Sequence, residues 1–438
     1  MTPSIGMPPA PLSPPSAAEP LAAEQPAGSA PTQVALTPTP SPEILERTRL
    51  ITRRRLAPLA EAIDREGLYP REVLGELAAA GAFSGHLRSH GQPGDVGLAI
   101  ETIAAVAEVC GSTGFVAWCH AACGLYLEES GNPALQGQLL AEHIAGRRLG
   151  GTGLSNPMKT YAGIEKQLLR AVPDGDGYRL SGSLPWVSHL SADGYSAVVA
   201  EVVEADPGGA AQASSAAGPA GRQVMVLLPG SAPGVELVPC PTFSGMEGTS
   251  TYAIRLKDHH VGPDRVIADP ALPFIQRIRD AFVLLQCGFG LGVIQGSIAS
   301  MRAVQGPLGH VNRFLDDGPD QLDQELAELR QGLQRLARDL APGPTNPSPA
   351  QATERTIAVL EARAASSELA LRAAQSALLH QGARGYLASS EAQRRVRESH
   401  FVAIVTPALK HLRKEISRLR NLPVPESAGT PLPSPAAH

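Results

Sequence analysis

Apolar residues recur every three or four positions over residues 42–148, which is the period of a helix with one buried face. Val73, Leu74 and Leu77 are one example of this spacing. Near the start of the region, Ser41 precedes a proline and an acidic residue, an order typical of the first turn of a helix. The pattern therefore predicts an N-terminal helical domain over residues 42–148.

The pattern changes after about residue 149, where short runs rich in Val, Leu and Ile are separated by Gly, Pro and Asp. YSAVVAEVV (195–203), QVMVLLPG (223–230) and YAIRLKDHHV (252–261) have the length and composition of strands. We expect an antiparallel β domain over residues 149–268.

Helical periodicity returns over residues 269–421, with a break at the Pro-rich run APGPTNPSP. Long amphipathic helices joined by short breaks are typical of a four-helix bundle. The flanking residues 1–41 and 422–438 are rich in Pro and Ala and lack this periodicity, so we expect disordered tails. The predicted fold class is α+β, with an N-terminal helical domain, a middle antiparallel β domain and a C-terminal four-helix bundle.

Charge and composition exclude several classes of partner. Lys and Arg total 37 against 42 Asp and Glu, so no global positive field indicates binding to nucleic acid. The apolar run at 281–300 approaches the length of a membrane span, but Gln286 and Gln295 interrupt it. A buried helix is the better interpretation, and we expect no membrane partner.

The five cysteines are few and odd in number, which does not suggest a secreted disulfide framework and favours a cytoplasmic location. Cys119 and Cys123 flank His120 at a spacing that places both thiols on one helix face. A metal site would need a second ligand pair, and the sequence offers none, so packed thiols are the preferred interpretation.

The segment YRLSGSLPWVSHLS contains one of only two tryptophans. On an extended strand, Trp186 and Ser188 would point to one side, and Val187 and His189 to the other. An indole and a hydroxyl on one face suit either an ordinary half-buried strand or a platform for a flat polar ring.

The order of the predicted domains and several segments resemble the acyl-CoA dehydrogenase superfamily over residues 42–420. The segments are GSTGFVAWCH, GGTGLSNP, YRLSGSLPWVSHLSADGYSAVVA, FSGMEGTSTYAIRLKDHHVGPDRVI and HQGARGYLASSEAQRRVRES. The resemblance implies a flavin-dependent oxidoreductase that oxidises a small organic substrate, such as a CoA or carrier thioester. It implies FAD as the cofactor, with FMN as the alternative.

The resemblance also assigns cofactor-binding residues. Trp186 would pack against the isoalloxazine ring, and Ser188 would donate a hydrogen bond toward its N5 atom. The remaining flavin contacts would come from Gly151, Thr152, Leu154 and Ser155 at the pyrimidine end, and from Gln381, Gly382 and Gly385 across a dimer interface. Arg313 is an imperfect match to the arginine that anchors the diphosphate. These contacts imply a homodimer or a homotetramer.

The family pattern breaks at the catalytic base. Dehydrogenation of an acyl thioester needs a carboxylate to remove the α-proton. By resemblance, Thr406 occupies the position of the glutamate in the commonest branch, and a neutral hydroxyl cannot replace it. A second branch has its glutamate near Ala281, which leaves the adjacent Asp280 as a candidate base.

Relatives without the carboxylate include flavin monooxygenases, which need an apolar cavity that excludes water and a flavin reductase as partner. A histidine often assists in them, and His120, His400 and His411 are the candidates. The sequence leaves dehydrogenase and monooxygenase open, together with a third possibility, a flavin-free scaffold without catalysis.

Overall fold

A computed structural model of the chain describes residues 41–90, 94–203, 221–341 and 347–421. The two predicted tails lie outside the described residues, apart from Ser41, at which the first helix begins. All elements below belong to the unit that follows residue 37.

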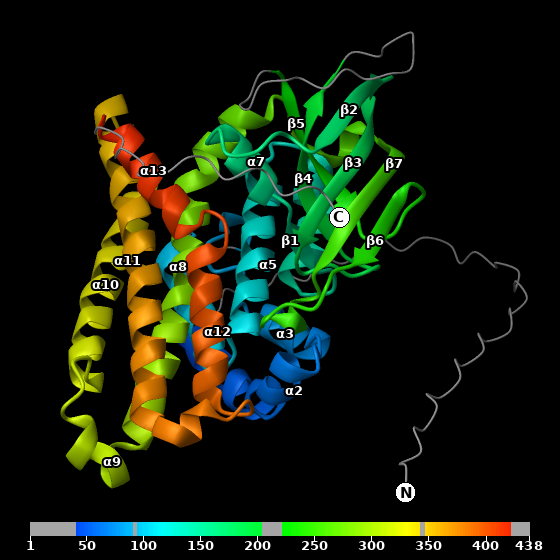
Figure 1. Ribbon diagram of the computed structural model, residues 1–438. Helices are drawn as coiled ribbons and strands as arrows, with labels where there is room; N and C mark the ends of the chain where they lie inside the picture. The colour runs from blue at the N-terminus through cyan, green and yellow to red at the C-terminus, as the bar shows by residue number, and fades with distance from the viewer. Residues whose placement is uncertain (1–40, 91–93, 204–220, 342–346, 422–438) are drawn as a thin grey trace, which may run out of the picture. The chain divides into compact units, whose positions relative to one another are not determined.

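Along the chain, helices come first and last and the strands lie between them; in space, the sheet lies to one side of the helices (Figure 1). The described N-terminal helices are α1 (Ser41–Ile51), α2 (Ala60–Arg65), α3 (Arg71–Ala79), α4 (Val96–Val109), α5 (Gly111–Glu129) and α6 (Leu140–Ile144). The C-terminal ones are α8 (Ala271–Ala303), α9 (Gln305–Asn312), α10 (Pro319–Asp339), α11 (Pro349–Gln381), α12 (Glu391–Ile404) and α13 (Leu409–Leu419). The predicted fold class is confirmed.

The strands form one eight-stranded sheet in the order β6-β7-β3-β2-β4-β5-β8, with β1 paired to β4. They are β1 (Gly150–Thr152), β2 (Leu169–Asp174), β3 (Gly177–Val187), β4 (Tyr195–Val202), β5 (Gln223–Pro229), β6 (Val235–Pro239), β7 (Tyr252–Val261) and β8 (Val266–Ala268). A short helix, α7 (Ser155–Tyr161), follows β1.

The β domain is mostly antiparallel, as predicted, but β1 and β2 both pair with β4 in parallel. β2 and β3 form an antiparallel hairpin, and β3 pairs with β7 on its other side. β4 therefore joins the free edge of β2, where it runs in the same direction as β2. Hydrophobic alternation does not reveal this choice of edge.

Helix α8 is the central helix of the bundle. It is long and apolar enough to cross a membrane by length and composition, but 89% of its most apolar window is buried inside the protein, as in a core helix. A Cβ atom at Gly288 would lie 2.6 Å from the carbonyl oxygen of Ile100, and one at Gly292 would lie 2.3 Å from that of Ala104. These glycines allow α8 to pack closely on α4. Gln286 on the same helix is fully buried.

One hydrophobic core joins the N-terminal helices, the bundle and one face of the sheet. Helix α5 contacts both β1 and α8, so it lies between the sheet and the bundle (Figure 1). The opposite face of the sheet has a second, smaller core that includes Leu180, Val187 and Val226.

Candidate active site

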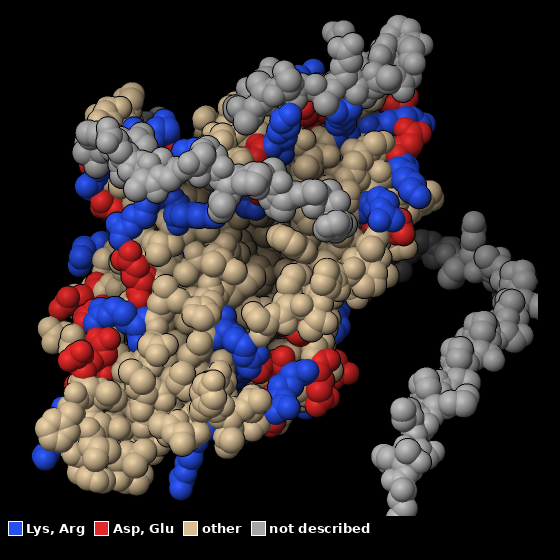
Figure 2. All heavy atoms as spheres, in the orientation of Figure 1, with Lys and Arg blue, Asp and Glu red and all other residues tan. Residues whose placement is uncertain are grey.

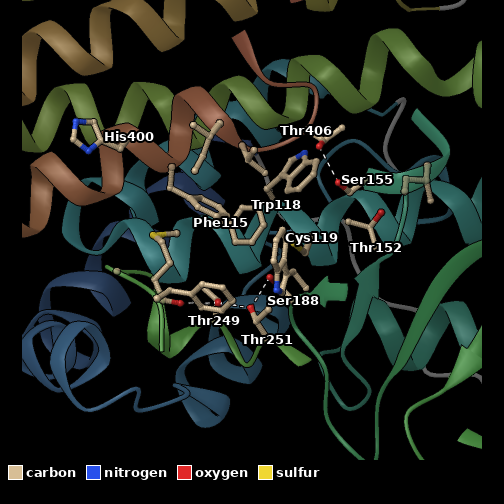
Figure 3. A pocket seen from close by; sticks show the side chains of 18 of the residues that line it. Phe115, Trp118, Cys119, Thr152, Ser155, Ser188, Thr249, Thr251, His400 and Thr406 are labelled. Atoms are coloured by element: carbon tan, nitrogen blue, oxygen red, sulfur yellow. Dashed lines mark hydrogen bonds between the residues drawn. The ribbon is translucent and has the colours of Figure 1, made fainter. Parts of the chain in front are cut away.

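A cavity of about 470 Å³ lies where α5, α8 and α12 meet β1 and the end of β3 (Figure 3). This volume is within the range of about 300–1,000 Å³ that is usual for small-molecule sites. Four of the eight phenylalanines and both tryptophans of the chain line it: Phe115, Phe243, Phe282, Phe401, Trp118 and Trp186. Aromatic residues make up only 4% of the chain, so their number at this cavity is unusually high.

The end of β3 supplies two of the predicted residues, but not as an extended strand. Trp186 and His189 have left-handed backbone, with φ of 53° and 64°, and the pairing of β3 with β7 shifts register before Val187. Trp186 and Ser188 both line the cavity, whereas Val187 packs in the smaller core. A turned backbone, rather than simple alternation, places the indole and the hydroxyl together.

A glycine on β1 allows this segment to approach. A Cβ atom at Gly151 would lie 2.7 Å from the carbonyl oxygen of Ser188, so a larger residue there would displace the segment. The next residue on β1, Thr152, lines the cavity, and its hydroxyl lies 2.9 Å from that of Tyr126. The close approach thus brings the predicted residues Thr152 and Ser188 to one wall.

A row of hydroxyl groups runs along this wall (Figure 3). The Ser188 and Thr251 oxygens are 2.7 Å apart, and those of Thr251 and Thr249 are also 2.7 Å apart. Thr249 donates in turn to the carbonyl oxygen of Met246 at 2.7 Å. Because hydroxyls both donate and accept, the row can turn toward a polar group of a ligand.

On the opposite side of the cavity, the hydroxyls of Ser155 and Thr406 are 2.8 Å apart (Figure 3). Ser155 begins α7, and Thr406 lies between α12 and α13. Leu154 also lines the cavity, so the cavity brings together Thr152, Leu154, Ser155, Trp186, Ser188 and Thr406, which the sequence indicated.

Among the described residues, the lining contains no Asp or Glu. Its two cations are Lys159 and Arg397. Each binds a carboxylate that does not line the cavity: Lys159 lies 2.8 Å from Glu165, and Arg397 lies 2.6 Å from Asp64. The thiol of Cys119 also lines the cavity, and burial raises its pKa well above its usual value. Both positive side chains at the cavity are therefore already paired with carboxylates outside its lining.

Asp280 does not fit the predicted role of base. It does not line the cavity and is buried between α8 and α11. Its carboxylate accepts hydrogen bonds from Arg355 at 3.1 Å and from Thr356 at 3.0 Å. The residue of α8 that lines the cavity is Phe282, two positions farther along and therefore on another side of the helix.

His120 does not line the cavity either, because it belongs to a separate buried cluster with His86, His143 and His189. The rings of His120 and His143 stack at 3.7 Å, and the Nε2 atom of each lies 3.0–3.1 Å from the backbone carbonyl oxygen of the other. The backbone N–H of Gly150 donates to Nδ1 of His120, so both ring nitrogens are engaged.

The other two candidate histidines differ in position. His400 lines the cavity and is exposed, whereas His411 is buried and lines a separate cavity between α7, α8 and α13. His400 is thus the predicted histidine with access to a ligand in the aromatic cavity.

The residues predicted to act across a dimer interface lie together, away from the cavity lining. The amide of Asn312 donates to the carbonyl oxygen of His380 at 3.1 Å, which joins the end of α9, where Arg313 follows, to the end of α11, where Gln381 is the last residue and Gly382 follows. Gln381 donates to Ser300 at 2.8 Å, and Gly382 has a φ of 58°. Gly385 is buried against Gln381.

This region is rich in exposed apolar side chains. Phe314 and Tyr386 are 78% and 79% exposed, and Leu387 is 61% exposed. Figure 2 shows few charged side chains over α9 and the neighbouring end of α11. An apolar area of this kind is typical of a protein–protein contact.

Sequence reasoning missed most of the cavity wall, namely Phe115, Trp118, Phe282, Phe401, Thr249 and Thr251. The signal that could have found part of it is the rarity of aromatic residues, since GSTGFVAWCH contains both Phe115 and the second tryptophan. Among the described residues, no group of three or more His, Cys, Asp or Glu side chains could hold a metal ion.

Comparison with known proteins relates the chain to one family. Residues 41–147 match the model of the acyl-CoA dehydrogenase N-terminal domain. The chain is 22% identical over 389 residues to the probable acyl-CoA dehydrogenase YngJ of Bacillus subtilis (strain 168), an alignment that covers 82% of this chain and 92% of that protein. The resemblance to the acyl-CoA dehydrogenase superfamily is therefore confirmed. These relatives support a flavin-dependent oxidoreductase.

Solved structures extend this likeness to the whole fold. Butyryl-CoA dehydrogenase from Megasphaera elsdenii has a TM-score of 0.67 at 17% identity and covers 86% of this chain and 97% of its own. Dibenzothiophene monooxygenase (TdsC) from Paenibacillus sp. A11-2 has a TM-score of 0.70 at 16% identity, and the match covers 87% of this chain and 99% of the TdsC chain. TdsC has been solved with FMN and indole. The superfamily fold is thus shared by a dehydrogenase and a monooxygenase and does not distinguish them.

The cavity fits a flavin ring by its chemistry. A flavin is a flat ring with an apolar end and a polar end, and the cavity offers aromatic faces beside the hydroxyls of Thr152, Ser155 and Ser188. The indole of Trp186 is 62% exposed and meets the ring of Phe243 edge-on at 6.3 Å, so its face is open to a ligand. These residues could hold the ring.

Proposed function

We propose that the chain is a flavin-dependent monooxygenase that transfers one atom of O₂ to a small apolar substrate. The observation that supports the proposal is the absence of Asp and Glu from the lining among the described residues. Removing the α-proton of an acyl thioester requires a base with a pKa near neutrality. The hydroxyl of Thr406, which is bonded to Ser155, cannot serve as that base.

Trp186, Ser188, Thr152 and Ser155 are the residues that would hold the flavin. When bound, the reduced flavin would supply the two electrons with which O₂ and two protons convert a substrate C–H group into an alcohol and water. The electrons would come from NAD(P)H through a separate flavin reductase.

The side chains of the cavity suit this chemistry. Phe115 stacks on Trp118 at 5.5 Å, and the ring of Phe401 packs edge-on against Phe115 at 4.8 Å. Trp118 also packs against Phe282 at 5.1 Å. This aromatic wall would exclude water from the reacting atoms and favour an apolar substrate. His400 lines the cavity and is exposed, so a ligand and solvent can both reach its ring.

Dehydrogenation of an acyl thioester remains the second candidate. The relationship to a probable acyl-CoA dehydrogenase favours it. It would require a proton acceptor other than a carboxylate, and His400 is the imidazole that lines the cavity. The two candidates therefore differ in whether O₂ enters the product.

We extend the proposal to the cofactor, the oligomeric state and the location. FAD or FMN would be the cofactor. The exposed apolar side chains Phe314, Tyr386 and Leu387 support a homodimer or homotetramer in which a second subunit covers them. The cysteines are free thiols, which agrees with a cytoplasmic location.

The deciding experiment follows the fate of oxygen. The purified protein is loaded with FAD or FMN and supplied with NADH, a flavin reductase, isotopically labelled O₂ and a panel of indoles, phenols and thiophenes. Label in a product supports the monooxygenase. Anaerobic bleaching of the flavin by acyl-CoA substrates, without label in any product, would establish the dehydrogenase instead. A protein that binds neither flavin would be a scaffold.

A further inference from the structure

Arg363, on α11, is fully buried beneath the end of α12. Each nitrogen of its guanidinium group donates to a neutral acceptor. Nε donates to the side-chain oxygen of Gln286 at 2.7 Å, Nη2 donates to the carbonyl oxygen of Val402 at 2.6 Å, and Nη1 donates to the hydroxyl of Ser367.

No carboxylate lies within ion-pair distance of Arg363 in the part of the chain that the structure describes. Burial lowers its pKa to about 10, so the group is still charged at neutral pH. The last four carbonyls of a helix lack intrahelical partners and carry partial negative charge. Val402 supplies one of these carbonyls for α12, which ends at Ile404. The end of α12 therefore acts as the counter-charge of Arg363.

Gln286 continues this network to the cavity. It is fully buried on α8, and its amide donates to the carbonyl oxygen of Thr406 at 3.1 Å. Arg363 thus holds Val402 directly and Thr406 through Gln286. Between these two points lie Ile404 and Val405, which line the cavity together with Thr406.

We infer that Arg363 and Gln286 are positioning residues that fix the segment from Val402 to Thr406 as one wall of the cavity. A buried arginine is costly unless its donors are satisfied. Here Nη2 binds the wall at Val402 and Nε binds Gln286, which holds the wall at Thr406. Phe401 precedes this segment and packs on Phe115, which stacks on Trp118. Loosening the segment should therefore expose Trp118. The inference does not depend on which ligand the cavity binds.

Tryptophan fluorescence tests this inference without a cofactor. The chain has two tryptophans, so Trp186→Phe leaves Trp118, which is 3% exposed, as the sole indole. In that background, Arg363→Met and Gln286→Leu should both raise the acrylamide quenching constant of Trp118 from the value of a buried indole toward that of an exposed one. Arg363→Lys keeps the charge and one donor group, so it should restore part of the shielding.

Arg395→Met is the matched control. Arg395 is 2% exposed on α12 and donates to the carbonyl oxygen of Ala107 at 3.1 Å, but it does not line the aromatic cavity. Arg395→Met should lower Tm, because a buried arginine and its hydrogen bonds are lost, but it should not expose Trp118. The inference is overturned if Arg363→Met and Gln286→Leu leave Trp118 shielded, or if Arg395→Met exposes it equally. If Arg363→Met does not fold, Gln286→Leu decides the question.

Discussion

The aromatic cavity and the histidine cluster share helix α5 and differ in the partners of their polar groups. Trp118 contributes to the cavity and His120 to the cluster, two positions apart and therefore about 200° apart around the helix. In the cavity, hydroxyls such as Ser188 bond to one another and can turn toward a ligand. In the cluster, the imidazoles bond to backbone carbonyls and to buried tyrosines.

The difference shows that residue type is a poor guide to catalysis in this protein. Histidine is the usual acid–base residue near neutral pH, but burial lowers the pKa values of His120 and His143 well below their ordinary range. These imidazoles stay neutral and act as buried hydrogen-bonding groups. The residues available for chemistry are the hydroxyl side chains that line the cavity, such as Ser188 and Thr406, and the exposed His400.

The largest expected effect comes from acid. Burial lowers the pKa of His86 from 6.5 to about 4 and that of His189 to about 3. Below pH 6.5 the unfolded state binds protons that the folded state does not, so stability is full above pH 6.5 and falls as the pH falls toward these folded values. Between pH 6.5 and its folded-state pKa, each such histidine should lower the free energy of unfolding by about 1.4 kcal/mol for every pH unit.

Denaturant unfolding from pH 7 to pH 5 measures this loss. His86→Gln is the matched variant, because its amide can still donate to the carbonyl oxygen of Ala121, which His86 contacts at 3.0 Å, and it does not titrate. Carboxylates contribute equally to both proteins, so the variant should lose less stability between these pH values. Equal slopes would mean that His86 does not stay neutral in the fold.

Removing one member of the histidine cluster should have the next largest effect. His143→Leu would leave the hydroxyl of Tyr195 and the carbonyl oxygen of His120 without the partners they now have at 2.8 and 3.0 Å. Each unsatisfied buried group costs about 1–3 kcal/mol, so Tm should fall by several degrees. Flavin affinity should not change.

His260→Leu is the control for this variant, because His260 is 49% exposed and makes only a long contact of 3.9 Å with Asp174. Its stability should stay within about 0.5 kcal/mol of the parent protein. Weaker flavin binding in His143→Leu, at unchanged folding, would place the cluster in the active site.

Sequence reasoning predicted the element types, because long periodic helices and short apolar runs are local signals. The family was indicated separately, by the resemblance of several segments. It placed Trp186 and Ser188 together correctly, but for the wrong local reason, since two left-handed residues break the strand there. It could not distinguish Asp280 from Phe282, because a two-residue shift along α8 decides which side chain reaches the cavity. Nor could it see that His120 is stacked on His143, which lies 23 positions away. Such long-range contacts leave no local pattern.

A smaller effect is expected at the turned end of β3. If the flavin lies against this wall, Trp186→Ala loses a stacking face worth about 0.5–1.5 kcal/mol, and Ser188→Ala loses a hydrogen bond worth about as much. Each should weaken flavin binding by roughly 2- to 10-fold. Titration of flavin into the apoprotein, followed by fluorescence, measures both changes.

Val187→Ala is the matched control for these two variants. Val187 is 4% exposed in the smaller core, so its loss should lower stability by about 1 kcal/mol or more while flavin affinity stays the same. Equal flavin affinity in all three variants would show that this wall does not hold the cofactor.

An effect no larger than these is expected at Thr406, and its size separates two roles for this residue. Thr406→Val keeps the shape of the side chain but removes the hydroxyl that lies 2.8 Å from that of Ser155. If the hydroxyl only orders the wall, the loss is one hydrogen bond of about 0.5–1.5 kcal/mol, which corresponds to a roughly 2- to 10-fold change in kcat/KM. Thr406→Ser, which keeps the hydroxyl, should retain most of the activity. A loss of several orders of magnitude in the valine variant, with normal folding and flavin content, would instead assign Thr406 a role in catalysis, because one lost hydrogen bond that only orders the wall cannot account for a loss of that size.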